Sequence, residues 1–219
     1  MANGNQQPRL CQVVDLMSTR TCNALSNYPI KATFSHGGMI GDVPVICGGW
    51  FRSYTSECYA HDVSHDAWKL LARMTTERAR HASVVVGEAL WLTGGRAYKP
   101  SLTVLASTEY VFLNGTVVQG PVLPLPLHEH SMVKLADNRI MIIGDNVKSQ
   151  KVLVYDPKTN VFSEGPTLLE KRRNAACTLF QSAKHDGRPV VLAAGGYDSR
   201  TAEILDYSKE NATWERSMH

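Results

Sequence analysis

The chain has 219 residues, of which 43% are hydrophobic and 20% are charged, and its formal net charge is +3. This length and balance are typical of a folded protein with a substantial core, and they exclude collagen, coiled-coil and disordered chains. No apolar run approaches the roughly 18 residues of a membrane-spanning helix, and so small a net charge does not by itself indicate nucleic-acid binding.

Residues 1–9 are polar and lack the apolar segment of a secretory signal, so they are predicted to form a disordered N-terminus. Short apolar runs separated by turn-forming residues follow them to the end of the chain. Many of these runs contain β-branched or aromatic residues, which favour strands, and no convincing amphipathic helix is present. The sequence therefore predicts an all-β chain.

Four segments repeat one order of runs: a first run, a turn, a second run ending in glycine, a loop, a third run and a fourth. The first runs are 32–34, 83–86, 131–135 and 176–180, and the second are 45–49, 92–95, 142–145 and 193–196. The third runs are 57–59, 109–112, 152–156 and 203–206, and the fourth contain Trp68, Val117 or Val118, Phe162 and Trp214. The second runs recur about every 50 residues, a period typical of propeller blades.

The glycine pair after a second run, the Tyr155-Asp156 pair and the bulky aromatic residue that follows resemble the Kelch repeat. Arg78-Ala79-Arg80-His81, ahead of a first run, fits the same family. The resemblance covers roughly residues 10–217 and implies a Kelch-type β-propeller of four-stranded blades, each with its innermost strand first. It departs from the family pattern at Gly144-Asp145, where the second glycine is missing.

On this alignment, one propeller domain contains an N-terminal outer half blade and four complete four-stranded blades. The half blade is 10–29, and the complete blades are at about 30–74, 75–124, 125–168 and 169–217. Such a ring is incomplete, because Kelch propellers usually close by pairing strands from both ends of the chain in one blade. The chain is therefore expected to be a fragment of a longer propeller, or to close irregularly or with another molecule.

Antiparallel order places the loops from second to third strands on the same face as the loops between blades. Arginine and aromatic residues dominate these loops, and the partner-binding candidates are Trp50, Phe51, Arg52, Tyr54, Arg78, Arg80, Arg96, Tyr98, Arg172, Arg173, Tyr197 and Arg200. This composition is enriched in protein-binding hot spots and favours carboxylate or phosphate groups on the partner. We expect a protein partner with acidic groups and no nucleic acid, although some of these residues could instead cap strands or stack in the interior.

The cysteines suggest two disulfides. Cys11 with Cys22, and Cys47 with Cys58, could each lie across adjacent antiparallel strands. Their placement resembles Kelch modules of secreted or cell-surface invertebrate proteins, which implies an oxidising compartment. The alternative is a cytosolic protein with reduced cysteines, and Cys177 is expected to be a buried free thiol on an inner strand.

Two sequons, at Asn114 and Asn211, are glycosylation candidates on the face opposite the arginine-rich loops. A zinc-like spacing of Cys58, His61 and His65 is not expected to bind metal, because alternate side chains of a strand point to opposite faces.

No catalytic motif stands out: there is no nucleophile elbow and no phosphate-cradling glycine loop. We therefore predict a non-enzymatic protein-protein interaction module without a cofactor, and favour an extracellular location. One alternative is an intracellular Kelch adaptor or a fragment of a ubiquitin-ligase substrate receptor. The other is a copper enzyme of the galactose oxidase type, for which the sequence marks no Tyr and His cluster.

Overall fold

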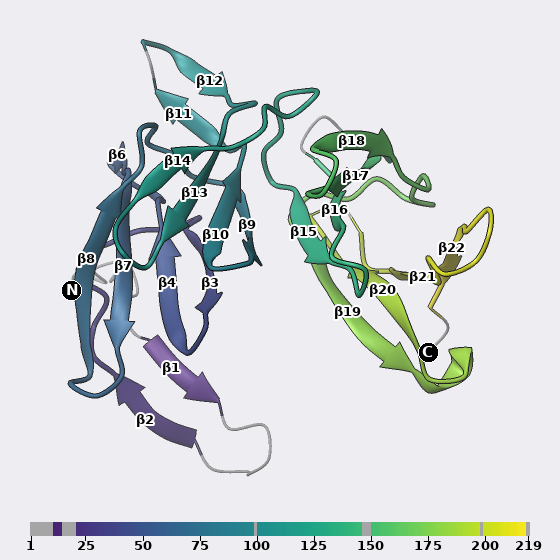
Figure 1. Ribbon diagram of the computed structural model, residues 1–219, viewed down its shortest axis with the longest axis horizontal. Coiled ribbons are helices and arrows are strands. Elements are labelled where there is room, and N and C mark those ends of the chain that lie inside the picture. Colours follow the sequence, from purple (N-terminus) through teal and green to yellow (C-terminus); the bar gives the residue numbers. More distant parts are fainter. Residues whose placement is uncertain (1–10, 15–20, 99, 146–149, 198, 218–219) are drawn as a thin grey trace, which may run out of the picture.

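The computed structural model describes residues 11–14, 21–98, 100–145, 150–197 and 199–217 (Figure 1). Its regular structure consists of strands and one short 3-10 helix, η1 (Ala183–His185), and these residues contain no α-helix. The prediction of an all-β chain is confirmed.

Four antiparallel sheets, each of four strands, follow one another along the chain. The first sheet contains β3 (His36–Ile40), β4 (Val43–Cys47), β7 (Glu57–Asp62) and β8 (Ala67–Arg73). The second contains β9 (Ala82–Val86), β10 (Ala89–Thr93), β13 (Thr108–Phe112) and β14 (Val117–Gln119). The third contains β15 (Ser131–Lys134), β16 (Ile140–Ile143), β17 (Val152–Asp156) and β18 (Val161–Glu164). The fourth contains β19 (Ala176–Ser182), β20 (Arg188–Ala194), β21 (Ala202–Leu205) and β22 (Trp214–Arg216).

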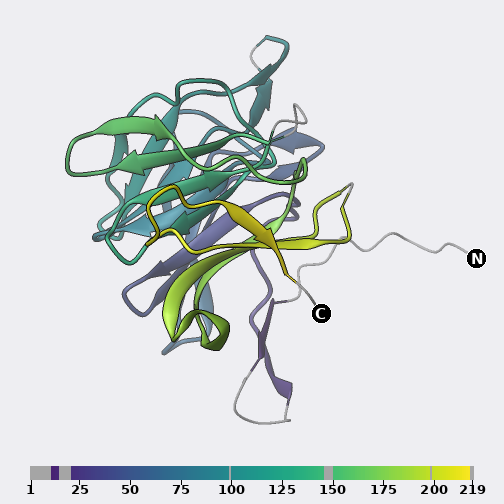
Figure 2. The ribbon, with the colours of Figure 1, turned by 90° about the vertical axis from the view of Figure 1, so that its right-hand side faces the viewer.

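Three two-stranded hairpins complete the regular structure of the described residues. The first, β1 (Cys11–Val14) with β2 (Thr21–Leu25), projects from the body of the four sheets (Figure 2). The others are β5 (Trp50–Phe51) with β6 (Ser53–Tyr54), and β11 (Arg96–Tyr98) with β12 (Leu102–Val104). Each of these two lies within the loop from the second to the third strand of its sheet.

The core lies between successive sheets, and strand periodicity decides which side chain enters which part of it. Along β10, Leu90 and Leu92 join Val45 in a cluster between the first and second sheets. Trp91, between them in sequence, points to the other face and packs with Ile140 of the third sheet. A third cluster joins the third and fourth sheets and includes Met141, Ile143, Val191, Leu205 and Trp214.

The first strand of the first sheet is not where the sequence predicted it. Residues 32–34 form only an isolated bridge, between Thr33 and Trp50, and Phe34 has a left-handed backbone with φ 58°. The strand is β3, which contains two glycines and so lacks strand propensity. A Cβ on Gly37 would clash with the backbone oxygen of Val45 in the paired strand β4, and a Cβ on Gly38 would meet Leu90 at 3.0 Å across the sheet interface. Close packing on both sides of β3 therefore favours glycine over a better strand former.

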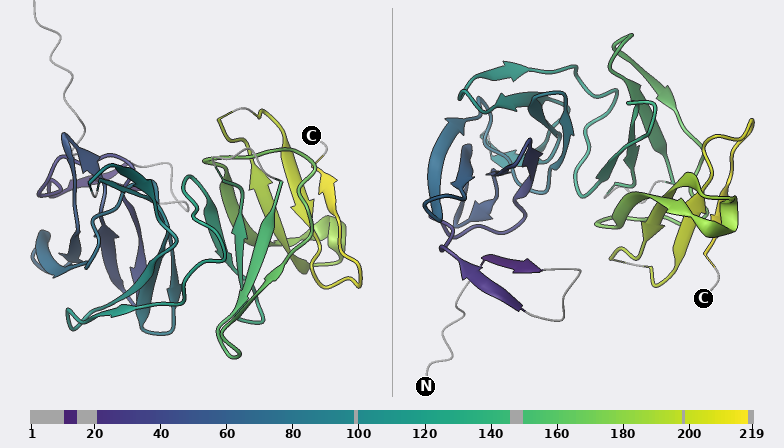
Figure 3. Two further views of the ribbon diagram at one scale, coloured as in Figure 1. Left: turned by 90° about the horizontal axis from the view of Figure 1, so that it is seen from above. Right: turned by 60° about the horizontal axis from the view of Figure 1, so that its bottom comes forward.

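The four sheets are arranged in an arc, with their first strands side by side (Figure 3). Strand β3 contacts β9, β9 contacts β15, and β15 contacts β19. Within the described ranges no sheet closes on itself, and each ends in two edge strands. None of the helical structure that the described residues form is long and apolar enough to span a membrane.

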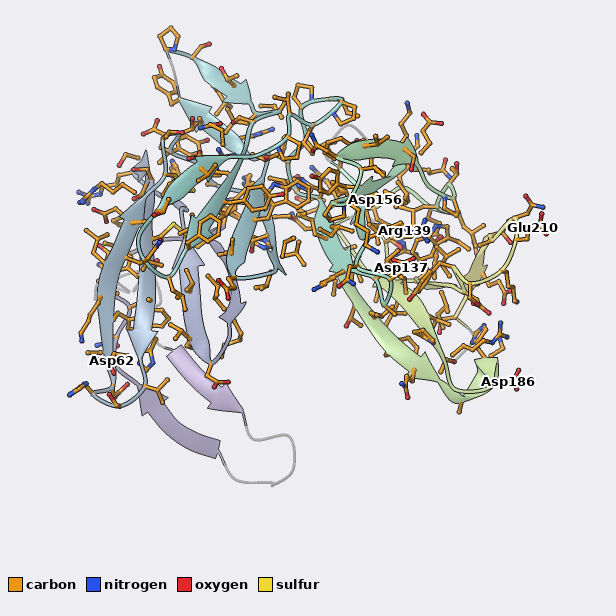
Figure 4. All side chains as sticks on the ribbon, viewed as in Figure 1. Asp62, Asp137, Arg139, Asp156, Asp186 and Glu210 are labelled. Atoms are coloured by element: carbon orange, nitrogen blue, oxygen red, sulfur yellow. A yellow bond between two sulfur atoms is a disulfide. The ribbon has the colours of Figure 1, made fainter. Side chains whose placement is uncertain are left out.

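In an antiparallel sheet, successive connections alternate between the two ends of the sheet. The loops between sheets and the hairpins β5–β6 and β11–β12 emerge at one end, which we call the loop end and which lies at the top of Figure 1 for the first two sheets. Asp62, the last residue of β7, and Asp186, in the connection from β19 to β20, lie at the opposite end (Figure 4).

Candidate functional site

Backbone hydrogen bonds tie together the four loops that lead into the first strands. Phe34, Arg80, Glu129 and Asn174 occupy corresponding places in these loops, and all four have φ between 53° and 61°. Arg80 N donates to Phe34 O (3.0 Å), Glu129 N to Arg80 O (2.9 Å) and Asn174 N to Glu129 O (2.7 Å). This chain of bonds brings side chains from four separate repeats to one place at the loop end.

The side chains on this backbone chain form an ion-pair cluster. The Arg80 guanidinium bonds to Oε1 of Glu129 and lies over the Phe34 ring, 3.8 Å from its centroid. Nη1 of Arg173 lies 3.8 Å from Oε2 of the same carboxylate, and its guanidinium lies 4.0 Å from the Tyr197 ring centroid. Stacking and ion pairing therefore hold both guanidiniums in fixed orientations.

A third arginine belongs to the same group. Nε of Arg96 donates to Nε2 of His128 at 3.0 Å, and Nδ1 of His128 lies 3.9 Å from Oε2 of Glu129. Burial and the nearby charges of Arg96, Arg80 and Arg173 lower the pKa of His128 to about 4. The ring is therefore neutral at pH 7, as its role as a hydrogen-bond acceptor requires. We call Arg80, Arg96 and Arg173, with Glu129 and His128, the arginine cluster.

The arginine cluster carries excess positive charge. Burial and the neighbouring Arg96 lower the pKa of Arg80, but a guanidinium stays charged at pH 7. Within the arginine cluster, the single carboxylate of Glu129 faces three guanidiniums. Among these described residues positive charge is in excess, so the cluster favours anions.

An aromatic pocket lies beside the cluster, between hairpins β5–β6 and β11–β12. Its volume is about 310 Å³, and it is lined by Trp50, Arg52, Ser53, Tyr54, Glu77 and Tyr98. Trp50 is 42% exposed and Tyr98 is 62% exposed, so both present aromatic surface to solvent. The structure therefore brings four of the predicted partner-binding residues together: Trp50, Arg52, Tyr54 and Tyr98.

The remaining exposed candidates are more scattered. Phe51 lies in a different cavity, of about 380 Å³, which Lys31 and Glu57 also line. It points away from the aromatic pocket because neighbouring residues of a strand face opposite sides. Arg200 is exposed in the loop that follows β20.

Two predicted partner-binding residues, Arg78 and Arg172, are not on the surface at all. Both side chains have 0% exposure. Nη2 of Arg78 bonds to Glu109 (2.6 Å), and its Nη1 bonds to Gly94 O (2.7 Å). Arg172 repeats the arrangement with Glu203 (2.8 Å between Nε and Oε1). The expectation that these arginines meet a partner is corrected, because their donors satisfy groups inside the protein.

Sequence reasoning missed the two glutamates that complete these pairs. Glu109 also accepts hydrogen bonds from the backbone of Thr75 and Thr76, and Glu203 does the same for Leu169 and Glu170. Each glutamate thus fixes the loop that carries its arginine. A signal was present, because the arginine and the glutamate are 31 residues apart in both repeats.

The disulfide between Cys47 and Cys58 is present, as predicted. The two residues face each other across β4 and β7, with a Cα separation of 4.0 Å, and both are completely buried. For the other predicted pair, the backbone of β1–β2 pairs Cys11 with Leu25, and the side chains of Cys11 and Cys22 lie outside the described residues.

Other predicted positions are placed as follows. Cys177 is a free thiol but only half-buried, and burial raises its pKa to about 11. Asn114 and Asn211 are exposed in the turns before β14 and β22, at the end opposite the arginine cluster. Of the zinc-like residues, Cys58 is in the disulfide and His61 bonds to Asp66 at 3.0 Å.

No protein-family model matches this chain. Among curated proteins it is similar to the spermatocyte protein spe-26 of Caenorhabditis elegans, with 24% identity over 168 residues. The matched region is 72% of this chain but only 28% of that protein, so the chain spans less than a third of this relative's length. At this identity the similarity does not show a family.

Proposed function

We propose that this chain is a Kelch-type β-propeller module that acts as a non-catalytic protein-interaction domain. Four four-stranded antiparallel sheets in chain order support the propeller, as do their first strands, which lie side by side along the arc. Two local features also recur from repeat to repeat: the loop residues with positive φ and the internal Arg–Glu pairs. Such recurrence supports a repeated structural unit. In this proposal β1–β2 is the outer half of a further blade.

The observation that carries the interaction function is the arginine cluster with the aromatic pocket beside it. Together they offer exposed aromatic area and stacked, pre-oriented guanidiniums at one end of the molecule. Such side chains dominate binding energy at protein interfaces, and excess guanidinium charge selects acidic partners. The proposed ligand is therefore a protein segment that combines acidic and apolar side chains.

A comparison of captured proteins tests this function. Immobilised wild-type chain is compared with Arg173→Gln and Tyr98→Ala at the loop end, and with Arg139→Gln as a matched control. Arg139 pairs with Asp137 in the β15–β16 turn (both labelled in Figure 4), and its side chain is 43% exposed. We expect wild type and the control to capture a protein that neither loop-end variant captures. When that protein is purified, its affinity for each loop-end variant should be at least tenfold lower than for wild type. Equal capture by all four proteins overturns the proposal.

We propose an oxidising, extracellular location on the strength of the Cys47–Cys58 disulfide. The rival is an intracellular Kelch adaptor. Thiol mapping by mass spectrometry of non-reduced protein from its native source separates the two. A Cys47–Cys58 bridge supports the extracellular proposal, while free thiols at both positions favour the adaptor.

A further inference from the structure

Glu129 occupies an unusual position for an acid on a basic surface. Its side chain is only 5% exposed, its backbone is left-handed with φ 61°, and it lies two residues before the first strand of the third sheet. Phe34, Arg80 and Asn174 share this backbone conformation, so it belongs to the repeated loop. The side chain of Glu129 is distinctive because it pairs with two guanidiniums, Arg80 and Arg173, which come from the loops before the second and fourth sheets.

Both guanidiniums reach solvent as well as Glu129. Each arginine side chain is 29% exposed, and each has one face on an aromatic ring. A guanidinium has five N–H donors in one plane, so Arg80, bound to a carboxylate on one edge, can present another edge to a second acceptor, and Arg173 adds its positive charge beside it. The rings of Phe34 and Tyr197, 43% and 74% exposed, flank this position.

We infer that Arg80 and Arg173 form a binding site for one carboxylate of the partner, and that Glu129 is a built-in counter-anion that sets the site's affinity. This inference rests on the proposed function. Glu129 holds the guanidiniums in a binding orientation, which lowers the cost of ordering them when the partner arrives. Its negative charge also opposes the incoming carboxylate, so the site binds more weakly than the two arginines would alone.

The charge balance favours a carboxylate as the ligand group. His128 is neutral at pH 7, so the charged groups of the arginine cluster are three guanidiniums and the Glu129 carboxylate. Positive charge is therefore in excess among these residues, which favours an anionic group such as a carboxylate. A glutamate or aspartate side chain that also places a neighbouring apolar residue in the aromatic pocket would satisfy both features of the loop end.

The test uses a fluorescently labelled hexaglutamate peptide, with affinity measured by fluorescence anisotropy at low salt. Glu129→Gln removes the charge but keeps an oxygen acceptor for Arg80. We expect this variant to bind the peptide roughly tenfold more tightly and to show a steeper loss of affinity with added salt. Arg80→Gln and Arg173→Gln are expected to bind roughly tenfold more weakly, and Arg139→Gln to stay within about twofold of wild type.

The outcomes separate this inference from the proposed function. If both arginine variants weaken binding but Glu129→Gln binds no tighter, the counter-anion role is wrong and the loop end remains a binding surface. If wild type does not bind the peptide, or no variant changes its affinity, the carboxylate site fails as well.

A second variant covers the case in which Glu129→Gln does not give a folded protein with a normal thermal transition. Glu129→Asp keeps the charge and shortens the side chain, so its affinity is expected to stay within about twofold of wild type. A tenfold gain in that variant would show that packing, and not charge, sets the affinity, and would overturn the inference.

Discussion

Arg78 and Glu109 form an ion pair of 2.6 Å with both side chains at 0% exposure. The pair joins the loop that precedes the second sheet to the third strand of the same sheet. Arg172 and Glu203 repeat the arrangement in the fourth sheet, at 2.8 Å. These pairs show that part of the arginine content of the loops is internal scaffolding for the loop end and not surface charge.

Removing one member of this pair should strongly destabilise the fold. Arg78→Ala leaves the Glu109 carboxylate buried without its charged partner, and the expected loss is about 3–5 kcal/mol in the free energy of unfolding. Urea denaturation monitored by tryptophan fluorescence measures it. The control is Arg73→Ala, because Arg73 and Glu57 form a 2.7 Å pair with side chains 60% and 24% exposed. An exposed pair contributes at most about 1 kcal/mol, so similar losses in both variants would contradict the structural role of Arg78.

The Cys47–Cys58 disulfide should be a major source of stability for the first sheet. It closes a short loop, with a sequence separation of 11, and constrains the unfolded chain. We expect the double substitution Cys47→Ala with Cys58→Ala to cost about 3 kcal/mol, measured by urea denaturation without reductant. Cys177→Ala is the control, since this half-buried thiol is not bridged. A double variant as stable as the control would show that the bridge contributes nothing.

Local pattern was sufficient to predict most strands, because short apolar runs and glycine-ended turns are local features of the chain. It failed at β3, where the strand residues are selected by a neighbouring sheet. A Cβ added to Gly38 would lie 3.0 Å from the side chain of Leu90, which is far away in sequence. No property of residues 36–40 alone indicates that contact.

The candidate site was predicted less completely than the fold, for a similar reason. Placement in a loop does not decide whether an arginine side chain faces water. Arg78 and Arg80 lie two positions apart in the same loop, yet one is buried and the other is partly exposed. Arg78 is buried on Glu109, while Arg80 is 29% exposed in the arginine cluster. Which of them meets solvent depends on distant acids, and the role of Glu129 at the cluster's centre was not anticipated.

Trp214 should be an essential core residue. Its side chain is 3% exposed in the cluster between the third and fourth sheets, and its Nε1 donates to Pro166 O at 2.8 Å. Trp214→Ala is expected to cost about 3–5 kcal/mol, through lost burial and an unpaired carbonyl. Trp50→Ala, at a side chain 42% exposed, is expected to cost less than about 1 kcal/mol. Equal losses in chemical denaturation would contradict the assignment of Trp50 to the binding surface.

Buried histidines should make the fold sensitive to mild acid. Burial and the nearby His36 and His128 lower the pKa of His130 to about 3, and burial lowers the pKa of His81 well below 6.5. The unfolded chain therefore binds protons near pH 6.5 that the folded chain excludes. The free energy of unfolding is therefore highest above pH 6.5. It decreases as the pH falls from 6.5 toward the folded-state pKa values, by up to about 1.4 kcal/mol per pH unit for each histidine.

Urea denaturation between pH 7.5 and pH 5 measures this loss before the carboxylates with lowered pKa values, such as that of Asp206, begin to titrate. His130→Gln removes one titrating group and keeps a partner for Thr93, whose Oγ1 lies 2.7 Å from Nε2 of His130. The variant should therefore lose less stability than wild type over the same pH range, even if it is less stable at pH 7.5. An unchanged pH dependence in His130→Gln would mean that this histidine is not held neutral by the fold, and that the acid sensitivity has another source.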